Sequence, residues 1–215
     1  MLVSTATEFR TFDYKTTLKM MKDAGFTAFD LSLMDRGTDI PEIFCGDDYV
    51  KVAHEVRAYA DSIGLPCNQA HAIFGSHLGA AKPDTKLFAD TVRCMEIAAI
   101  IGAKAIVVHP MQFVPYMGNV EFLKKENYEF YKDLVPYAEK FGIIVLTENM
   151  WQFNPNNKTI VQSTCAEAKE FAEYVDMIDS PYLKACLDIG HTVLTGESVK
   201  NMILTLGHDR LFGLH

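Results

Sequence analysis

Two kinds of segment alternate along the chain, and they differ in the spacing of their apolar residues. Short runs rich in branched apolar residues are typical of strands buried on both faces of a parallel sheet. Between them, apolar residues recur every three or four positions, which is the period of an amphipathic helix. The strands are expected at 2–5, 28–33, 66–70, 105–108, 143–147, 183–187 and 211–214. The helices are expected at roughly 14–24, 48–63, 84–101, 119–141 and 165–178.

Glycines repeat in step with this alternation. Gly25, Gly64, Gly102 and Gly142 each follow a helical segment and precede a strand, at intervals of 39, 38 and 40 residues. Glycine is the usual residue just after a helix, because it adopts the left-handed conformation without strain. One β-α unit per interval predicts an α/β fold, the (β/α)8 TIM barrel. A doubly wound open sheet is the alternative, but it usually has a glycine-rich turn after its first strand, and residues 5–9 form none.

The number of expected strands is one short of a closed barrel. The chain ends at His215, at the end of the seventh expected strand, whereas a closed barrel of this type has eight strands. No shift in composition marks a linker. We therefore expect a single barrel domain over residues 1–215 that lacks its C-terminal strand and helices. Such an open barrel is expected to expose apolar core surface.

Side chains that can bind metals or transfer protons stand where the expected strands end. The carboxyl ends of barrel strands meet at one mouth, so residues far apart in sequence come together there. Chance is a weak explanation for five such ends in five, since 7 histidines and 28 acidic residues are spread over 215 positions. Carboxylates and imidazoles are ligands that borderline divalent metals accept. From the third strand to the seventh, the residues are His71, His109, Glu148, Asp188 (with His191 beyond it) and His215.

Most of these residues also have a simpler structural interpretation. Asp188 could cap the helix that follows it, and His191 could be a solvated loop residue. His71 and His109 could be buried histidines bonded to backbone carbonyls. Glu148 is harder to explain in this way, because a carboxylate at the end of a fully buried strand is costly without a cation or several donors. Three further histidines, on helices or loops, are expected to be solvated: His54, His77 and His208.

The composition narrows the range of functions. A net charge of -8 and a pI near 5.3 leave no basic field for the phosphate backbone of nucleic acid. The five cysteines are an odd number without C-x-x-C spacing, which indicates reduced thiols and a cytoplasmic protein. No apolar run is long enough to cross a bilayer, so no membrane partner is expected.

Four short stretches at the strand ends resemble those of a known superfamily. In these stretches and in its order of elements, the whole chain resembles the xylose-isomerase-like TIM-barrel superfamily. That superfamily holds sugar and sugar phosphate isomerases and epimerases, together with the class II apurinic endonucleases. The stretches are Val108-His109-Pro110, Thr147-Glu148-Asn149, Leu187-Asp188-Ile189-Gly190-His191 and Phe212-Gly213-Leu214-His215.

The resemblance implies a divalent metal cofactor, which would be manganese, cobalt, magnesium or zinc. Glu148, Asp188 and His215 correspond to metal ligands of the superfamily. A carboxylate on the eighth strand completes that set in the superfamily, and this chain lacks it. His109 is a further candidate ligand, and His191 corresponds to a residue that touches the substrate or a second metal.

On this basis we expect a metal-dependent isomerase or epimerase that acts on a sugar or sugar phosphate through an enediolate intermediate. Glu148 and His191 are the candidate catalytic residues. His71, Trp151 and again His191 are the candidate substrate-binding residues. Aromatic residues of the loops are expected to wall the mouth and stack on a sugar face. They are Phe74, Phe113, Tyr116, Trp151 and Phe153.

Two other functions stay open. One is a zinc-dependent phosphodiesterase of the apurinic endonuclease type, and the other is a sugar-binding barrel without catalysis. The acidic balance opposes the phosphodiesterase, and Lys82 and Lys158 are isolated cations in their loops, so nucleic acid is not the expected partner. The oligomeric state is not fixed, and a homo-oligomer is compatible with the sequence. The phosphodiesterase ligands would be His71, His109, Glu148, Asp188, His191 and His215.

Overall fold

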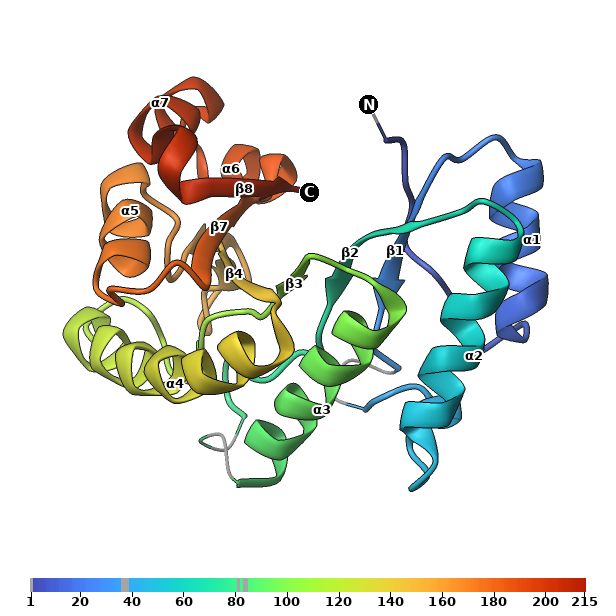
Figure 1. Ribbon diagram of the computed structural model, residues 1–215. Helices are drawn as coiled ribbons and strands as arrows, with labels where there is room; N and C mark the ends of the chain where they lie inside the picture. The colour runs from blue at the N-terminus through green and yellow to red at the C-terminus, as the bar shows by residue number, and fades with distance from the viewer. Residues whose placement is uncertain (1, 36–38, 81, 83–84) are drawn as a thin grey trace.

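A curved parallel sheet with helices on its outer side makes up the fold (Figure 1). It is seen in a computed structural model that describes residues 2–35, 39–80, 82 and 85–215. The strands follow the order β1-β2-β3-β4-β7-β8, and every neighbouring pair is parallel. Their bounds are β1 Phe29–Ser32, β2 Cys67–His71, β3 Ala105–Val107, β4 Ile144–Glu148, β7 Leu183–Leu187 and β8 Leu211–Leu214.

Five helices lie within a few residues of their expected positions, and they form the outer layer. α5 begins three residues later than expected, because Cys165 has a left-handed backbone (φ 63°) that no helix contains. The structure thus confirms the α/β barrel class that the alternation of strand and helix patterns predicted. The helices are α1 Tyr14–Asp23, α2 Tyr49–Ser62, α3 Thr85–Ile101, α4 Val120–Phe141 and α5 Ala168–Asp176, with a short 3-10 turn at Glu42–Phe44.

Two further helices, α6 (Ile189–Thr195) and α7 (Val199–Arg210), were not predicted from the apolar period, although a helix after Asp188 was the alternative interpretation of that residue. α6 has only seven residues, and Gly207 breaks α7 with a non-helical backbone (φ 63°, ψ -174°). Apolar residues of both helices are exposed to solvent, including Val193 and Leu204. Their apolar positions therefore do not form the single buried stripe that marks an amphipathic helix.

The first expected strand, at residues 2–5, does not form a regular strand. The segment runs beside β1 and bonds to it, since the Asp30 amide donates to the Thr5 carbonyl (2.9 Å). Its ladder is limited to one bridge between Ala6 and Asp30. Leu2 and Val3 are about half exposed, so full burial of this segment was a wrong expectation.

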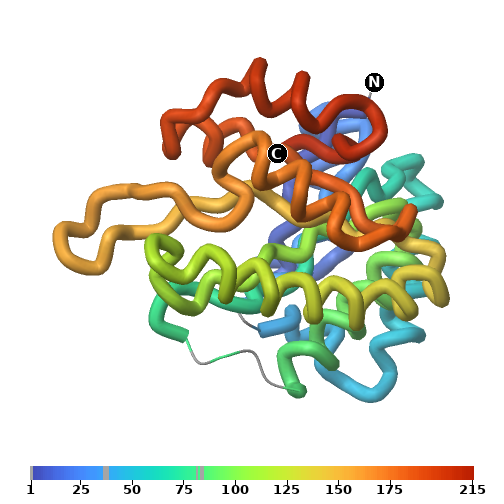
Figure 2. The backbone as a smooth tube through the Cα atoms, turned by 90° about the vertical axis from the view of Figure 1, so that its left-hand side faces the viewer, coloured from blue at the N-terminus to red at the C-terminus, as the bar shows by residue number. Residues whose placement is uncertain are grey.

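An antiparallel hairpin that the sequence pattern did not predict follows β4. It consists of β5 (Trp151–Phe153) and β6 (Ile160–Gln162). Each strand has only three residues, too few for an alternating pattern to stand out. Figure 2 shows the hairpin projecting from the body of the molecule as the orange loop. The hairpin therefore lies next to the carboxyl end of β4 in the chain.

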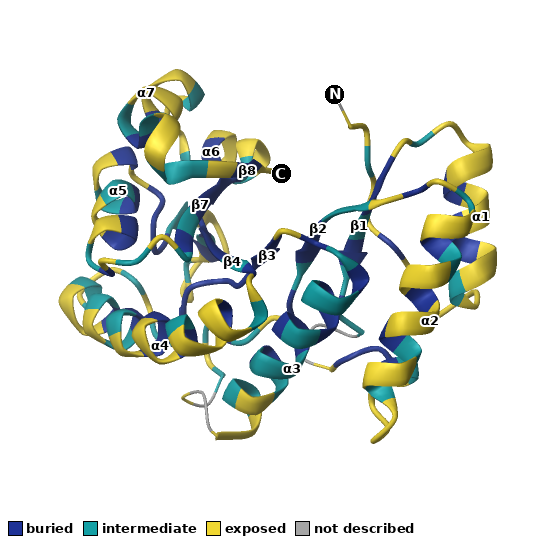
Figure 3. Cartoon of the chain, viewed as in Figure 1, coloured by how far each residue is buried: buried dark blue, intermediate teal, exposed yellow. Residues whose placement is uncertain are grey.

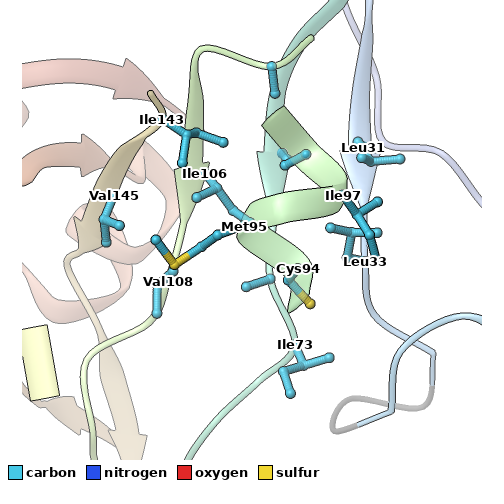
Figure 4. Packing of buried hydrophobic residues seen from close by; sticks show 14 of the residues in the cluster. Leu31, Leu33, Ile73, Cys94, Met95, Ile97, Ile106, Val108, Ile143 and Val145 are labelled. Atoms are coloured by element: carbon cyan, nitrogen blue, oxygen red, sulfur yellow. The ribbon is translucent and has the colours of Figure 1, made fainter. Parts of the chain in front are cut away.

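The core lies between the sheet and the helices, and the outward helix faces are exposed (Figure 3). Figure 4 shows Met95 of α3 reaching toward Ile106 and Val108, while Ile97 of the same helix lies near Leu33. The fully buried side chains among these are Met95, Ile97, Ile106 and Leu33, and Val108 is 3% exposed. Each such burial contributes about 1.5–3 kcal/mol. This packing holds the strands in the register that brings their carboxyl ends together.

The barrel is incomplete, with β1 and β8 at the two ends of the strand order. Apolar side chains of β8 are exposed at its end, with Phe212 at 50% and Leu214 at 55%. Among the described residues, no helix is both long and apolar enough to cross a membrane.

Candidate functional site

Glu148, the last residue of β4, lies at the centre of the candidate site. It is 1% exposed, and β4 is an inner strand that pairs with β3 and β7. The preceding Thr147 lies 2.8 Å from the hydroxyl of Tyr131 in α4, which is also 2.8 Å from the Val108 carbonyl. The Tyr131 hydroxyl therefore donates to the carbonyl and accepts from Thr147. This link fixes the end of β4 against the neighbouring strand.

Four histidines surround the Glu148 carboxylate. Nε2 of His109 lies 2.9 Å from Oε2, and Nε2 of His71 lies 3.8 Å from the same oxygen. The other oxygen, Oε1, is 3.3 Å from Nδ1 of His215 and 3.7 Å from Nδ1 of His191. His71 ends β2, and His109 and His215 follow β3 and β8, whereas His191 lies in α6, the helix that follows β7. The ends of the parallel strands therefore bring the four histidines together.

The proton positions on two of these rings follow from their partners. Nδ1 of His71 is 2.7 Å from the Ala72 carbonyl, which can only accept, so Nδ1 carries the proton. Nε2 of His71 then accepts from Nε2 of His109, 3.0 Å away. Nε2 of His109 also lies 2.9 Å from Oε2 of Glu148, and its single proton can bond only one of these two partners. While it bonds His71, Oε2 of the buried Glu148 has no hydrogen-bond partner among the described residues.

The environment keeps the carboxylate charged and one imidazole neutral. Burial opposes ionisation of Glu148, but the imidazoles of His109 and His215 hold the pKa of its carboxyl well below its usual range. Burial, together with the neighbouring His109, lowers the pKa of His71 to about 3. Burial also opposes protonation of His215, but its bond to Glu148 raises its pKa overall. At neutral pH the site thus presents a carboxylate beside a neutral imidazole.

The donor set fits a divalent cation. His71, His109 and Glu148 each offer one ligand atom within 4.8 Å of the others, and Glu148, Asp188 and His191 form a second such group. The unpartnered, buried Oε2 of Glu148 is costly without a counter-charge. Two imidazoles and a carboxylate are a ligand set that zinc and other borderline divalent metals accept. His215 lies outside both groups, although it contacts Glu148.

Asn149 ties the second group to β4. Its side chain accepts from the Asp188 amide (2.8 Å) and donates to the Asp188 carbonyl (3.0 Å). Its own carbonyl accepts from Nδ1 of His191 (2.9 Å), which leaves Nε2 of His191 as the free nitrogen. Asp188 also caps α6, because Oδ1 accepts from the His191 amide (2.6 Å). The capping interpretation is therefore correct, and it places Oδ2 3.9 Å from Nε2 of His191.

A cavity of about 690 Å³ opens above the cluster and reaches two of its histidines, His109 and His191. Aromatic rings form much of its wall. Trp151 packs edge-on against Phe153 (4.9 Å between ring centroids) and His191 (6.2 Å), and Phe74 stacks on His109 (4.7 Å). The remaining lining residues are Ser76, His77, Leu78, Gln112, Met150, Gln152, Pro155 and Lys158.

Gln112 is a functional candidate that the sequence pattern did not reveal. Its Oε1 accepts from the Ser163 hydroxyl (3.0 Å) and its backbone amide donates to Oγ of Ser76 (2.9 Å). Its side-chain nitrogen has no partner in the described part of the chain, and the residue lines the cavity. A lone glutamine in a loop belongs to no periodic pattern and no known motif, so only its spacing from His109 could have drawn attention to it.

Some of the residues predicted from the sequence line the cavity, and others do not. His71 is not among the residues that line the cavity and lies in the group around Glu148, and its expected contact with substrate stays a prediction. Phe113 is buried against Phe122, and Tyr116 also lies outside the cavity lining, because the loop after β3 turns them inward. The three histidines expected to be solvated are all exposed, namely His54, His77 and His208.

Comparison with known sequences gives a family match and a weaker match to curated relatives. The family profile described as "Xylose isomerase-like TIM barrel" matches residues 18–215. A protein named "Probable endonuclease 4" from Mesomycoplasma hyopneumoniae (strain 7448) is 29% identical over 126 residues. That match covers 58% of this chain and 42% of the relative, so it spans less than half of the relative's length.

Solved structures with the same fold include sugar epimerases and an endonuclease. A D-tagatose 3-epimerase-like protein has a TM-score of 0.72 at 21% identity, covering all of this chain and 75% of its own. The 3-keto-D-glucoside 4-epimerase from E. coli has a TM-score of 0.74 at 17% identity, with coverages of 100% and 78%. Endonuclease IV from Thermus thermophilus has a TM-score of 0.66 at 20% identity, with coverages of 99% and 75%. At these identities the likeness shows the fold alone.

Proposed function

The chain belongs to the xylose isomerase-like TIM-barrel family, and we propose that it is a metal-dependent isomerase or epimerase of a sugar or sugar derivative. One observation carries the proposal: a cavity walled by aromatic rings is lined by His109 and His191, two of the histidines that surround the buried Glu148 carboxylate. Aromatic faces suit the C–H face of a sugar, and convergent polar groups suit its oxygens. The cavity volume, about 690 Å³, is also in the range of small-molecule sites.

The proposed metal ligands are Glu148, His109, Asp188 and His215. Glu148 and His109 lie nearest one another (2.9 Å), and His215 and Asp188 lie beside Glu148. The geometry adds His71, whose Nε2 faces the same carboxylate oxygen. A divalent cation held there would supply a Lewis acid that stabilises negative charge on a carbonyl oxygen.

The chain's own residues would bind the sugar and move its proton. His191 is the proposed acid-base group, because Nδ1 is held by the Asn149 carbonyl and Nε2 is free beside the cavity. Abstraction of the proton next to the carbonyl carbon gives an enediolate, and its return at either carbon gives an isomer or an epimer. Trp151 would pack against the sugar ring and exclude water.

A second candidate is a zinc-dependent phosphodiesterase. It is favoured by the histidine-rich donor set around Glu148 and by the relatives named as probable endonuclease 4. Against it, Lys158 is the only lysine or arginine among the described residues that line the cavity, and the chain has a net charge of -8. A sugar-binding barrel without catalysis is the third candidate.

The test combines metal content with proton exchange in the wild type and in Glu148→Gln. The purified chain is analysed for bound metal and incubated in D2O with D-tagatose and D-fructose, and NMR follows deuterium entering next to the carbonyl carbon. We expect bound manganese, cobalt or zinc and deuterium incorporation in the wild type, and a loss of both by at least about tenfold in Glu148→Gln. Glu139→Gln, an exposed change on α4, is the matched control and should retain both.

Other outcomes would select between the candidates. Two or three zinc ions per chain and cleavage of DNA at an abasic site, without deuterium exchange, would favour the phosphodiesterase. Sugar binding without deuterium exchange in any metal would favour the non-catalytic barrel. A wild type without metal would contradict the proposed enzyme.

A further inference from the structure

Lys158 stands at the tip of the hairpin between β5 and β6 in a left-handed backbone conformation (φ 61°). The turn is closed tightly, because the Lys158 amide donates to the Asn154 carbonyl (2.9 Å) and the Asn154 amide donates to the Thr159 carbonyl (2.7 Å). Oδ1 of Asn157 also accepts from the Thr159 amide (3.1 Å). A residue other than glycine is uncommon in this conformation and persists there when its surroundings fix it. The turn therefore fixes the backbone from which the Lys158 side chain projects.

Lys158 is exposed and belongs to the residues that line the cavity. It makes no ion pair or hydrogen bond with any residue that the structure describes. Other lysines do find carboxylates, as Lys82 does with Glu126 (2.7 Å) and Lys124 with Glu173 (2.8 Å). An ammonium group without a partner among the described residues is available to a charged group of a ligand.

The residues that line the cavity carry little charge. Among those that the structure describes, the lining holds one lysine, Lys158, and no aspartate or glutamate. Lys158 belongs to the hairpin that projects from the body of the molecule (Figure 2). An anionic group on a ligand is attracted to this lysine and meets no carboxylate in the described lining. The exposed His77, also in the lining, can donate a hydrogen bond to a ligand in the cavity. The uncharged aromatic residues Trp151 and Phe153 belong to the same lining.

We propose that Lys158 forms an anion subsite at the outer wall of the cavity, so that the preferred ligand is a sugar bearing a carboxylate or phosphate at the end remote from Glu148. The inference deepens the proposed function and rests on it for the sugar. What it adds to the proposed function is the negative charge on the ligand and the residue that recognises this charge.

The chain contains its own reporter for this subsite. Trp151 is the only tryptophan in the sequence and lies in the cavity lining, so its fluorescence reports binding there. The metal-loaded full chain is titrated with three ligands that differ only at carbon 6: D-tagatose, D-tagaturonate and D-tagatose 6-phosphate. We expect at least one anion to bind about five- to tenfold more tightly than D-tagatose at low salt, and the tighter of the two identifies the group.

Three variants separate a specific contact from general charge. Lys158→Met should bring the ratio of anion to D-tagatose affinity close to one, and Lys158→Arg should keep most of it. Lys200→Met, an exposed change on α7 outside the cavity lining, removes the same charge and should leave the ratio unchanged. An equal ratio in the wild type, or an unchanged ratio in Lys158→Met, overturns the proposal.

Two outcomes distinguish this proposal from the proposed function. Deuterium exchange with D-tagatose, but no preference for either anion, keeps the isomerase and overturns the subsite. A strong preference for the anion that depends on Lys158, without deuterium exchange in any metal, keeps the subsite and overturns the isomerase. Tight binding of a DNA duplex with an abasic site, weakened in Lys158→Met while all three sugars are unaffected, overturns the subsite as one for small molecules.

Discussion

Gln112 shows how a single residue is prepared for binding by the groups behind it. The Ser163 hydroxyl holds Oε1 at 3.0 Å, which fixes the amide so that its nitrogen is the end left without a partner in the described chain. Gln152 secures the same loop, because its side chain donates to the Gln112 carbonyl (3.1 Å) and accepts from the Tyr116 amide (3.0 Å). A donor fixed in this way loses little rotational freedom when it binds a ligand oxygen.

We predict that Gln112→Leu weakens binding of D-tagatose about three- to tenfold, because the donor is removed while the size of the side chain is kept. Trp151 fluorescence measures the affinity. Ser163→Ala, which keeps the amide but lets it turn, should have a smaller effect than Gln112→Leu. Metal content should be unchanged in both variants. Equal affinity in Gln112→Leu and the wild type would mean that this nitrogen does not contact the sugar.

At the scale of elements, the loop between β6 and α5 depends on one acidic side chain. Glu170 of α5 accepts from the amide of Cys165 (2.9 Å), the residue with the left-handed backbone. The adjoining Thr164 carbonyl accepts from the Met150 amide (3.0 Å), so the loop supports the chain just after Glu148. Burial raises the pKa of Glu170 to about 7, against the opposing hydrogen bonds from Tyr116 and Cys165.

The raised pKa predicts a stability that falls as pH rises. The folded state keeps the Glu170 proton up to about pH 7, whereas the unfolded chain releases it near 4.5. As the pH rises from 4.5 to about 7, the free energy of unfolding of the wild type therefore falls. Above about pH 7, Glu170 lowers it no further. Glu170→Gln cannot ionise, so its free energy of unfolding should exceed that of the wild type at pH 8 and approach it at pH 5. The gain is expected to be on the order of 1–3 kcal/mol.

Urea unfolding at pH 5, 6.5 and 8 measures this difference. Glu139→Gln, at an exposed position on α4, should show no such dependence on pH relative to the wild type. A difference between Glu170→Gln and the wild type that stays constant over this range would show that the carboxyl is not protonated in the folded protein.

The elements that could be predicted from sequence are those that bury one continuous apolar surface. The inner strands and α1 to α5 repeat such a surface, and capping glycines such as Gly142 (φ 66°) mark their ends. The β5–β6 hairpin, α6 and α7 bury less, so their residues follow no strong period. The strand ends placed Glu148 and its histidines together, because parallel strands of a barrel share one mouth. The partners of Gln112 and the turn of Lys158 depend on loop geometry, which no sequence period encodes.

At the scale of the whole molecule, the candidate site joins both halves of an open sheet. The chain contributes His71 from β2 on one side and His215 after β8 on the other, and their rings stack with centroids 5.6 Å apart across Glu148. A metal ion bound by the ends of several strands would therefore connect elements that are otherwise joined mainly through the sheet. Such binding stabilises the folded state, because the unfolded chain does not present the ligands together.

We therefore predict that removing metal lowers the unfolding temperature of the wild type by roughly 5–11 °C. A ligand at about one hundred times its Kd stabilises the folded state by about 2.7 kcal/mol, and a protein of this size shifts by about 2–4 °C per kcal/mol. Calorimetry with and without EDTA, followed by restoration with manganese, cobalt or zinc, measures the shift. Glu148→Gln should unfold at nearly the same temperature with and without EDTA, whereas Glu139→Gln should behave as the wild type does. If EDTA lowers the unfolding temperature of Glu148→Gln as much as that of the wild type, the metal that stabilises the fold is bound elsewhere.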